Sequence, residues 1–358
     1  MVAARAAEYK DAAARENRRV TSYDVAIVAG VSQSAVSRCF KPGASVSPAT
    51  HARVMIAASG LDYIPNAAAR SLITRRSQMV AVVMPHGGNL YSAETLAELS
   101  QQLARRGKRV LLFTVLQDTD VAHALGDIWQ YPVDGAIIAA ALTDGQVQEF
   151  ERRRLPMVMF NRTVRGRSVS SVLCDQHASG RLLASRLAAA GHRQFGIAAG
   201  PATSALATER CQGACDRLQE LRLPPPVVVP GQLDHAGGAR GLREIIGRLG
   251  KAPDAIICGN DVMALGCLDL ARHGLRIDVP GSMSVASFDA IEPPGWLGCN
   301  LTTLRQPLHN MALAAADLLT SMMETQGSHA GGRHTFVAQL VEGATARLAP
   351  LAHGSLAA

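Results

Sequence analysis

Four side chains between positions 33 and 38 could form hydrogen bonds with the edges of DNA bases. Gln33, Ser34, Ser37 and Arg38 have the spacing that places side chains on one face of a helix. A glutamine amide can pair with adenine, an arginine guanidinium with guanine, and a serine hydroxyl with a base edge or a phosphate. Taken alone, these residues fit an ordinary amphipathic helix with a solvated polar face about equally well. The surrounding elements therefore have to decide between the two interpretations.

The segment around these residues carries the start and stop signals of two short helices. Thr21 and Asp24 have the spacing of a capping box, which predicts a helix over residues 22–29. Gly30 can adopt the left-handed conformation that turns the chain sharply. A serine then caps a second helix, which we expect over residues 33–40. Two capped helices joined by a glycine turn predict a helix-turn-helix unit.

Two more helical segments are expected after this unit. Ser47 and Pro48 supply an N-cap and an N1 proline for a third helix that ends near Gly60. Pro65 can start a fourth segment, residues 66–73, which is rich in alanine. So short a helix should not persist in water unless it packs against something.

The distribution of charge supports the DNA-binding interpretation. Residues 1–78 contain eleven Lys or Arg and five Asp or Glu, a net charge of +6. The whole chain carries +7, so the remaining 280 residues contribute only +1. A basic module of this kind is expected where neutralisation of DNA phosphates drives affinity.

The overall composition is that of a globular protein that lies outside membranes. Of its 358 residues, 48% are hydrophobic and 18% are charged. No apolar run reaches the roughly 18 residues of a membrane span, and the N-terminus lacks the apolar core of a signal peptide. The seven cysteines are scattered and predict reduced thiols; Cys211 and Cys215 lack a second ligand pair, so no metal site is predicted. We therefore expect a cytoplasmic protein without a cofactor.

From Met79 onward, short apolar runs alternate with helical patterns. The candidate strands are Met79–Pro85, Arg109–Val115, Gly135–Ala141, Pro156–Asn161, Ser171–Asp175, Gln194–Ala199, Ala255–Gly259 and Met283–Phe288. The candidate helices are Ala93–Arg106, Ser179–Ala190, Thr208–Leu221 and Val262–His273. Continuous apolar strands alternating with helices predict parallel sheets covered on both faces, and their number suits two α/β lobes. In such folds ligands bind at the carboxyl ends of the strands, often in a crevice between lobes.

Polar residues follow several of these strands. Asn161, Asn260, Asp261 and Asp289 offer the short hydrogen-bonding groups that a hydroxyl-rich ligand needs. Asn and Asp also end strands and cap helices in many proteins, and Asp261 could be the cap of the helix that follows it. The convergence of these residues favours a ligand site. The motifs of nucleotide-binding loops, serine hydrolases and zinc proteases are absent, so no catalytic residue is predicted.

These motifs together resemble those of the LacI/GalR family of bacterial transcription regulators, over residues 20–345. The resemblance is carried by D-V-A-x-x-A-G-V-S-x-x-x-V-S-R from Asp24, V-S-P-A-T from Val46, Y-I-P-N-A-A-A-R-S-L from Tyr63, G-N-D-V-M-A-L-G from Gly259 and L-T-T-L-R-Q-P from Leu301. It implies an all-α helix-turn-helix head joined to a two-lobed α/β core that is similar to periplasmic binding proteins, with parallel sheets covered by helices.

On the DNA side, the resemblance implies a homodimer whose heads bind successive major grooves of a double-stranded, pseudo-palindromic operator. Gln33, Ser34 and Arg38 match the family's base readers, and residues 66–73 match a hinge helix that forms on the operator. Leu72 matches a leucine that wedges into the minor groove and kinks the DNA. The full set of expected DNA contacts is Ser22, Tyr23, Gln33, Ser34, Ser37, Arg38, Ser45, Ser47, Asn66, Ala69 and Leu72.

On the core side, the resemblance implies a small-molecule effector bound between the lobes, a sugar or sugar acid. The positions that match the family's effector contacts are His86, Leu90, Tyr91, Asn161, Arg210, Asn260 and Asp289. The sequence departs from the common family pattern at Thr208, where an arginine is usual, and at Ala290, where many members carry a second Asp. These departures leave the identity of the ligand open.

The predicted domain organisation follows from these matches. Residues 1–18 are expected to form a disordered extension, 19–64 the helix-turn-helix domain, 65–78 the hinge helix and linker, 79–346 the core and 347–358 a flexible tail. Within the core, the N-terminal lobe is expected over about 79–175 and 304–334, and the C-terminal lobe over about 176–303 and 335–346. The predicted function is a repressor whose operator affinity is controlled by the effector. The alternatives are a sugar-binding protein or a sugar-processing enzyme with a vestigial head.

Overall fold

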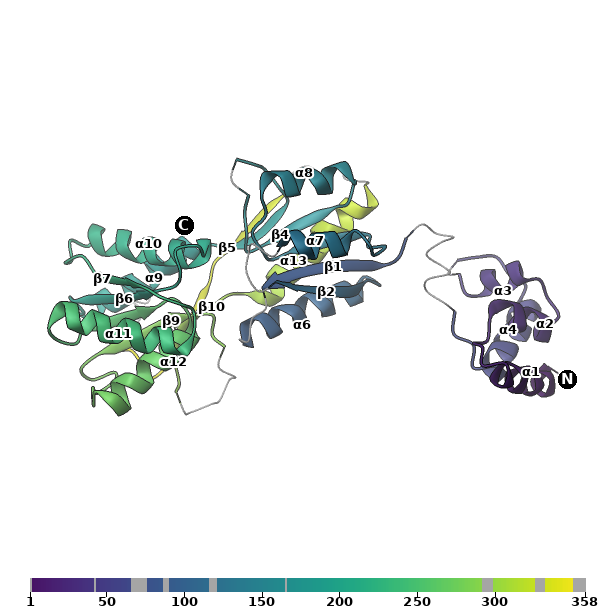
Figure 1. Ribbon diagram of the computed structural model, residues 1–358, viewed down its shortest axis with the longest axis horizontal. Coiled ribbons are helices and arrows are strands. Elements are labelled where there is room, and N and C mark those ends of the chain that lie inside the picture. Colours follow the sequence, from purple (N-terminus) through teal and green to yellow (C-terminus); the bar gives the residue numbers. More distant parts are fainter. Residues whose placement is uncertain are drawn as a thin grey trace. The chain divides into compact units, whose positions relative to one another are not determined.

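The computed structural model divides the chain into two compact units, Met1–Ser77 and Gln78–Ala358 (Figure 1). The structure describes residues 2–41, 43–65, 76–85, 90–115, 121–164, 166–291, 299–325 and 332–349. The predicted hinge helix, His86 and most of the predicted tail lie outside these residues.

In the described part of the first unit, the regular secondary structure is helical. The helices are α1 (Val2–Arg15), α2 (Ser22–Ala29), α3 (Gln33–Cys39) and α4 (Pro48–Gly60). Their apolar faces meet in one small core, in which Val25, Val36, Val54 and Ala57 are fully buried. The predicted helix-turn-helix is therefore α2, the Gly30 turn and α3.

The prediction of a disordered extension over residues 1–18 was wrong, because α1 packs against the other helices. Ala6 and Ala13 are 0% and 2% exposed, and both lie on the face of α1 that meets the rest of the unit. Gly60 makes the close approach possible, since a Cβ at that position would lie 2.7 Å from the Cβ of Ala6. Lys10 forms an ion pair with Asp62. The alanine content of this segment favours a helix, and its small side chains allow the backbones to come close together.

The second unit contains two six-stranded sheets, one in each lobe. The first has the order β11-β5-β4-β3-β1-β2, in which all neighbouring strands are parallel. Its strands are β1 (Met79–Pro85), β2 (Arg109–Val115), β3 (Gly135–Ile138), β4 (Met157–Phe160), β5 (Ser171–Cys174) and β11 (Arg333–Phe336). The second has the order β12-β10-β9-β8-β6-β7, with β12 antiparallel to β10 and the other pairs parallel. Its strands are β6 (Phe195–Ala199), β7 (Val227–Pro230), β8 (Ala255–Cys258), β9 (Ser284–Phe288), β10 (Thr302–Arg305) and β12 (Gln339–Val341).

Helices cover both faces of the first sheet, as the burial of β1 demonstrates. Val80 and Val82 belong to one buried cluster, whereas Ala81 and Val83 belong to another. Because successive side chains of a strand point to opposite faces, a strand buried on both sides must lie between two layers of helices. These helices are α6 (Leu90–Arg105), α7 (Val121–Ile128), α8 (Asp144–Arg152) and α13 (Leu308–Glu324). The second lobe is covered by α9 (Gln176–Ala189), α10 (Ala205–Glu220), α11 (His235–Leu249), α12 (Asp261–Asp269) and the π-helix η2 (Leu270–Gly274).

The chain passes between the two lobes three times, after β5, after β10 and after β11. Two of the predicted lobe boundaries, 303/304 and 334/335, fall inside β10 and β11. The observed boundaries lie about two residues later, at the ends of these strands. The reason is that β10 pairs with β9 as far as Leu304 and β11 pairs with β5 as far as Phe336. All seven cysteines are free thiols. No helix within the described ranges is long and apolar enough to cross a membrane.

Candidate ligand-binding cleft and nucleic-acid interface

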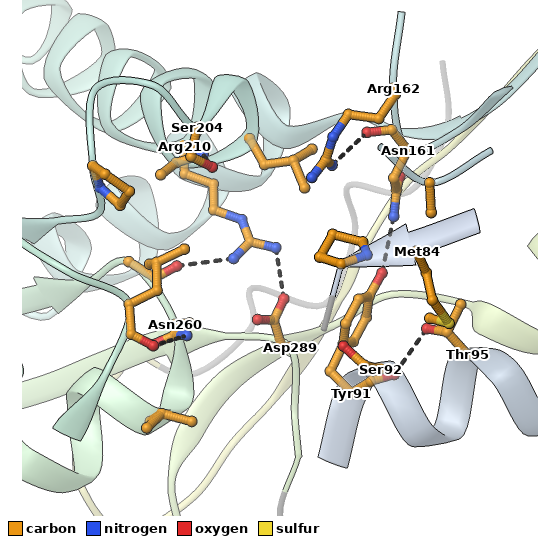
Figure 2. Close-up of a pocket in the computed structure, with 18 of the residues that line it drawn as sticks. Met84, Tyr91, Ser92, Thr95, Asn161, Arg162, Ser204, Arg210, Asn260 and Asp289 are labelled. Carbon is orange, nitrogen blue, oxygen red and sulfur yellow. Dashed lines mark hydrogen bonds and ion pairs between the residues drawn. The ribbon is translucent and has the colours of Figure 1, made fainter. Parts of the chain in front are cut away.

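A cavity of about 670 Å³ lies between the two lobes of the second unit, at the carboxyl ends of the parallel strands. Figure 2 shows Arg210 and Asn260 on one side of it, and Tyr91, Thr95 and Asn161 on the other. Residues from β1, α6, β4, α10 and the loop after β9 all contribute to its wall. The parallel-sheet topology therefore brings residues that are distant in sequence to one opening.

The centre of the cleft is a buried ion pair between Arg210 and Asp289. Nη2 of Arg210 donates to Oδ1 of Asp289 at 2.6 Å, and the two side chains are 7% and 9% exposed. The other guanidinium nitrogens donate to the Gly259 carbonyl (2.8 Å) and to Oε1 of Gln176 (2.7 Å). The guanidinium also lies over the ring of Phe288, 4.7 Å from its centroid. Burial acts to lower the pKa of Arg210, but the Asp289 carboxylate outweighs it and raises that pKa above its ordinary value.

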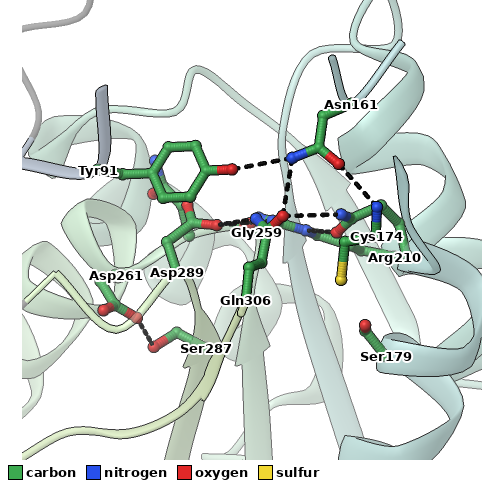
Figure 3. Close-up of polar contacts among 12 residues, drawn as sticks. Tyr91, Asn161, Cys174, Ser179, Arg210, Gly259, Asp261, Ser287, Asp289 and Gln306 are labelled. Atoms are coloured by element: carbon green, nitrogen blue, oxygen red, sulfur yellow. Dashed lines mark hydrogen bonds and ion pairs between the residues drawn. The ribbon is translucent and has the colours of Figure 1, made fainter. Parts of the chain in front are cut away.

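A second set of hydrogen bonds joins the N-terminal lobe to this pair (Figure 3). Asn161 donates from Nδ2 to the Tyr91 hydroxyl (2.9 Å) and to Oε1 of Gln306 (2.8 Å), and its Oδ1 accepts from the Cys174 amide (2.8 Å). Gln306 in turn donates to Oδ1 of Asp289 at 3.3 Å. Burial raises the pKa of Tyr91, so its hydroxyl stays protonated and can donate. Both lobes therefore share one continuous polar network.

Five of the predicted effector residues line this single cleft: Tyr91, Asn161, Arg210, Asn260 and Asp289. Leu90 begins α6, but its side chain is outside the described residues, as is the whole of His86. Asn260 is the N-cap of α12, because its Oδ1 accepts from the Met263 amide at 2.9 Å. The suggestion that Asp261 caps this helix was therefore wrong; Asp261 is the first helical residue and is 0% exposed.

Several residues of the cleft were missed by the sequence reasoning. They are Ser92, Thr95, Ser204, Asp234 and Gln306, together with Gln176 behind Arg210. Gln306 lies inside the L-T-T-L-R-Q-P motif, so its position directly after a short strand could have identified it. The others carry no sequence signal, because serine, threonine, aspartate and glutamine are common at helix ends and in loops. Among the described residues, no group of three or more His, Cys, Asp or Glu could hold a metal ion.

The helix-turn-helix is held together by its caps. Thr21 accepts from the Asp24 amide, and Asp24 accepts from the Thr21 amide at 2.8 Å, which completes the predicted capping box. Gly30 has φ 64° and ψ 44°, the left-handed conformation expected at the turn. Ser32 caps α3, since its hydroxyl accepts from the Ala35 amide at 3.2 Å. Phe40, predicted as the last residue of this helix, is its C-cap.

The predicted base readers lie on the outer side of α3. Ser34, Ser37 and Arg38 are exposed, Gln33 is half-buried, and Val36 between them is fully buried in the core of the unit. Of the remaining predicted DNA contacts, Tyr23, Ser45 and Ser47 are exposed and Ser22 is half-buried; Ser47 also caps α4. Asn66, Ala69 and Leu72 lie outside the described residues.

A two-lobed binding cleft and a helix-turn-helix unit in one chain define a transcription regulator with a ligand-binding core. Residues 21–66 match the model of the LacI family of bacterial regulatory proteins, and residues 184–346 match the periplasmic binding protein-like domain. The chain therefore combines a LacI-type DNA-binding domain with a periplasmic-binding-protein-like core, and its homologues are transcriptional repressors of the LacI family.

Similar proteins span almost the whole chain. The HTH-type transcriptional repressor CytR of Escherichia coli is 28% identical over 341 residues, which cover 94% of this chain and 99% of the relative. The ribose operon repressor of Haemophilus influenzae is 27% identical and covers 84% of this chain and 90% of the relative. Among solved structures, the Lac repressor dimer bound to operator and the anti-inducer ONPF is 25% identical, with a TM-score of 0.81 over 92% of this chain and 99% of that one.

Proposed function

We propose that this protein is a cytoplasmic transcriptional repressor that acts as a homodimer on a pseudo-palindromic operator, and that a neutral, hydroxyl-rich molecule in the cleft controls its operator affinity. The support for the dimer and the operator is the similarity to the Lac repressor, whose crystal structure is a dimer bound to operator. The support for the ligand is the chemistry of the cleft.

The proposed ligand is uncharged because the ion pair at the centre of the cleft is already balanced. A carboxylate beside Arg210 would have to displace Asp289 or lie next to its like charge, and both are unfavourable in a buried site. A hydroxyl group can instead accept from the remaining N–H groups of Arg210 and donate to Asp289. The bonds described above use Oδ1 of Asp289, which leaves Oδ2 as an acceptor. This pair is the observation that favours a sugar or similar polyol over a sugar acid.

In the proposed DNA complex, Gln33, Ser34, Ser37 and Arg38 read base edges in the major groove. The exposure of α3 supports these roles, together with the burial of Val36, which fixes the orientation of the helix. Ser22, Tyr23, Ser45 and Ser47 are proposed to contact phosphates. Residues 66–73 are proposed to fold as a hinge helix in the minor groove, with Asn66, Ala69 and Leu72 as contacts and Leu72 as the wedge.

The coupling between ligand and DNA is a thermodynamic linkage. A ligand changes operator affinity only to the extent that it binds the two arrangements of the lobes with different affinity. The polar network that runs from Asn161 to Asp289 joins the two lobes. A ligand that rearranges this network therefore changes the free-energy difference between the two arrangements of the lobes.

The proposal is tested by a thermal-shift screen with two matched groups of compounds. D-ribose, D-galactose and cellobiose represent neutral polyols, whereas D-gluconate and D-galacturonate represent sugar acids. We expect a neutral compound to raise the melting temperature and to change the affinity for an operator selected from random DNA. Stabilisation by the acids alone would contradict the proposed ligand class, and a failure to select any DNA sequence would contradict the proposed operator binding.

A further inference from the structure

Asp261 lies directly behind the cleft but is not among its lining residues. It follows β8 as the first residue of α12 and is 0% exposed. Three donors converge on its carboxylate: the hydroxyls of Ser287 (2.5 Å) and Thr303 (2.6 Å) donate to Oδ1, and the Ile291 amide (2.8 Å) donates to Oδ2 (Figure 3 shows the first). A buried carboxylate with three converging donors is a strong local constraint on the groups that donate to it.

The three donors belong to the elements that surround Asp289. Ser287 is on β9, two residues before Asp289, and Ile291 is two residues after it. Thr303 is on the neighbouring strand β10, and its hydroxyl also accepts from the Ala290 amide at 3.3 Å. Asp261 therefore ties the ends of three adjacent strands, β8, β9 and β10, to the turn that carries Asp289.

This turn needs to be held, because its backbone is in an unfavourable conformation. Asp289 has φ 101° and Ala290 has φ 51°, and neither is a glycine. Residues with side chains adopt such angles only where surrounding contacts fix them. Asp289 itself has one backbone bond, from its amide to the Leu304 carbonyl (2.9 Å). The amides of Ala290 and Ile291 are held by Thr303 and Asp261, and the Ala290 carbonyl accepts from Arg305.

We propose that Asp261 is a positioning residue for ligand binding: it holds the turn 289–291 so that Asp289 meets both Arg210 and the ligand. The inference rests on the proposed function, and it assigns a role to a residue that does not touch the cleft. An apolar residue or alanine at position 261 would leave the Ser287, Thr303 and Ile291 donors without their acceptor. The turn would then relax, and Asp289 would lose its fixed place.

The charge of Asp261 provides an independent way to observe this role. Burial raises the pKa of this carboxyl to about 6, although the hydroxyls of Ser287 and Thr303 oppose the shift. Other titratable or charged groups near it come from each neighbouring strand. Asp289 follows β9; Cys258 ends β8 and has a pKa raised by its contact with Cys267; and Arg305 on β10 donates to the Ala290 carbonyl at 3.3 Å. A protonated Asp261 carries its own O–H donor and can no longer accept all three hydrogen bonds. We therefore expect the turn 289–291 to be less firmly fixed as the pH falls through about 6.

The first experiment measures the turn without any ligand. Hydrogen exchange of the 284–291 peptide is followed by mass spectrometry at pH 7.5 in the full chain, in Asp261→Ala and in Asp261→Asn. Asp269→Ala and Asp269→Asn are the matched controls, because Asp269 ends the same helix and its side chain is 62% exposed. We expect exchange at Ala290 and Ile291 to be about tenfold faster or more in Asp261→Ala and unchanged in the controls. If Asp261→Ala does not fold, Asp261→Asn keeps the side-chain size and is compared with Asp269→Asn.

The second experiment measures the affinity for D-ribose, D-galactose and cellobiose by calorimetry at pH 5.5, 6.5 and 8. We expect the unaltered protein and Asp269→Asn to bind a compound about threefold more weakly or worse at pH 5.5 than at pH 8, since much of Asp261 is then protonated. Asp261→Asn should bind weakly at every pH, with no such profile. Unchanged exchange together with an unchanged affinity and pH profile in Asp261→Asn would overturn the inference. If none of the three compounds binds the unaltered protein, the proposed ligand class is wrong, and the exchange measurement alone decides the role of Asp261.

Discussion

Gln33 donates a hydrogen bond from Nε2 to the hydroxyl of Ser22, 3.2 Å away, so the first residue of α3 is tied to the first residue of α2. One proposed base reader is therefore held in place before DNA is bound. Arg38, on the same face of α3, makes no ion pair with any residue in the described ranges. A pre-positioned amide and an exposed guanidinium suit the reading of two different bases.

Arg38→Ala should remove one base contact and leave the core untouched. We expect specific operator binding to weaken by roughly 1–3 kcal/mol, about 5- to 150-fold, with little change in non-specific binding. Fluorescence anisotropy with operator and scrambled DNA measures both quantities. Arg152→Ala, an exposed arginine on α8, is the control for the loss of one positive charge. Equal weakening on both DNAs would assign Arg38 to the phosphate backbone instead.

Asp289→Asn should break the ion pair with Arg210 and abolish the ligand response. The buried guanidinium would lose its charged partner, which we expect to cost roughly 3–5 kcal/mol of stability. Operator binding without ligand should persist at temperatures where the variant is folded. A thermal-shift titration with the neutral sugars, followed by anisotropy with operator, checks both outcomes. A normal ligand titration in this variant would remove Asp289 from the site.

Gly60→Ala and Gly247→Ala should change stability in opposite directions. Alanine is normally about 0.5–1 kcal/mol better than glycine in a helix. At Gly247 on α11 a Cβ meets nothing within 4 Å, so that gain should appear as a higher melting temperature of the core. At Gly60 the Cβ would lie 2.7 Å from Ala6, and the overpacking, typically about 1–3 kcal/mol, should outweigh the gain. Calorimetry of the full chain separates the cases, and a stabilised Gly60→Ala would show that α1 does not dock as described.

The stability of the helix-turn-helix should depend on Asp24 at acidic pH. Burial acts to raise the pKa of Asp24, but hydrogen bonds from Arg18 and Thr21 outweigh it and hold that pKa below 3.8. A carboxyl with a lowered folded pKa contributes stability above its unfolded value, and this contribution is lost as the pH falls through the folded value. We expect the difference in melting temperature between the unaltered protein and Asp24→Asn to be constant from pH 7 to about pH 5, and then to shrink as the pH falls through the lowered folded-state pKa of Asp24. A difference that stays the same from pH 7 down to about pH 2 would contradict the assignment.

The sequence predicted the elements with strong local signals and missed those that depend on tertiary pairing. Thr21, Gly30 and Ser32 fix the helix-turn-helix through bonds within a few residues. The strands β1 and β2 were predicted at their observed bounds, because seven apolar residues run together in β1 and six apolar or β-branched residues follow Arg109 in β2. β10 and β12 are short and carry polar residues, and they are strands only because β9 and β10 offer an edge. The helix α1 was not predicted, because the packing of its alanines depends on Gly60, which is distant in the sequence and lies opposite Ala6 in the structure. Likewise, Gln176 and Gln306 belong to the cleft through contacts across more than a hundred residues.

The three passages between the lobes have a consequence for how the protein can respond. Two of them begin with glutamines of the polar network, Gln176 after β5 and Gln306 after β10, and these side chains bond to Arg210 and Asp289. Two of the three connections between the lobes thus begin with residues that support the pair proposed to face the ligand. Any rotation strains the bonds that define the binding site, and any molecule that stiffens those bonds restricts rotation. We therefore expect that substitutions of Gln176 or Gln306 that change ligand preference will also change the angle between the lobes in the absence of ligand.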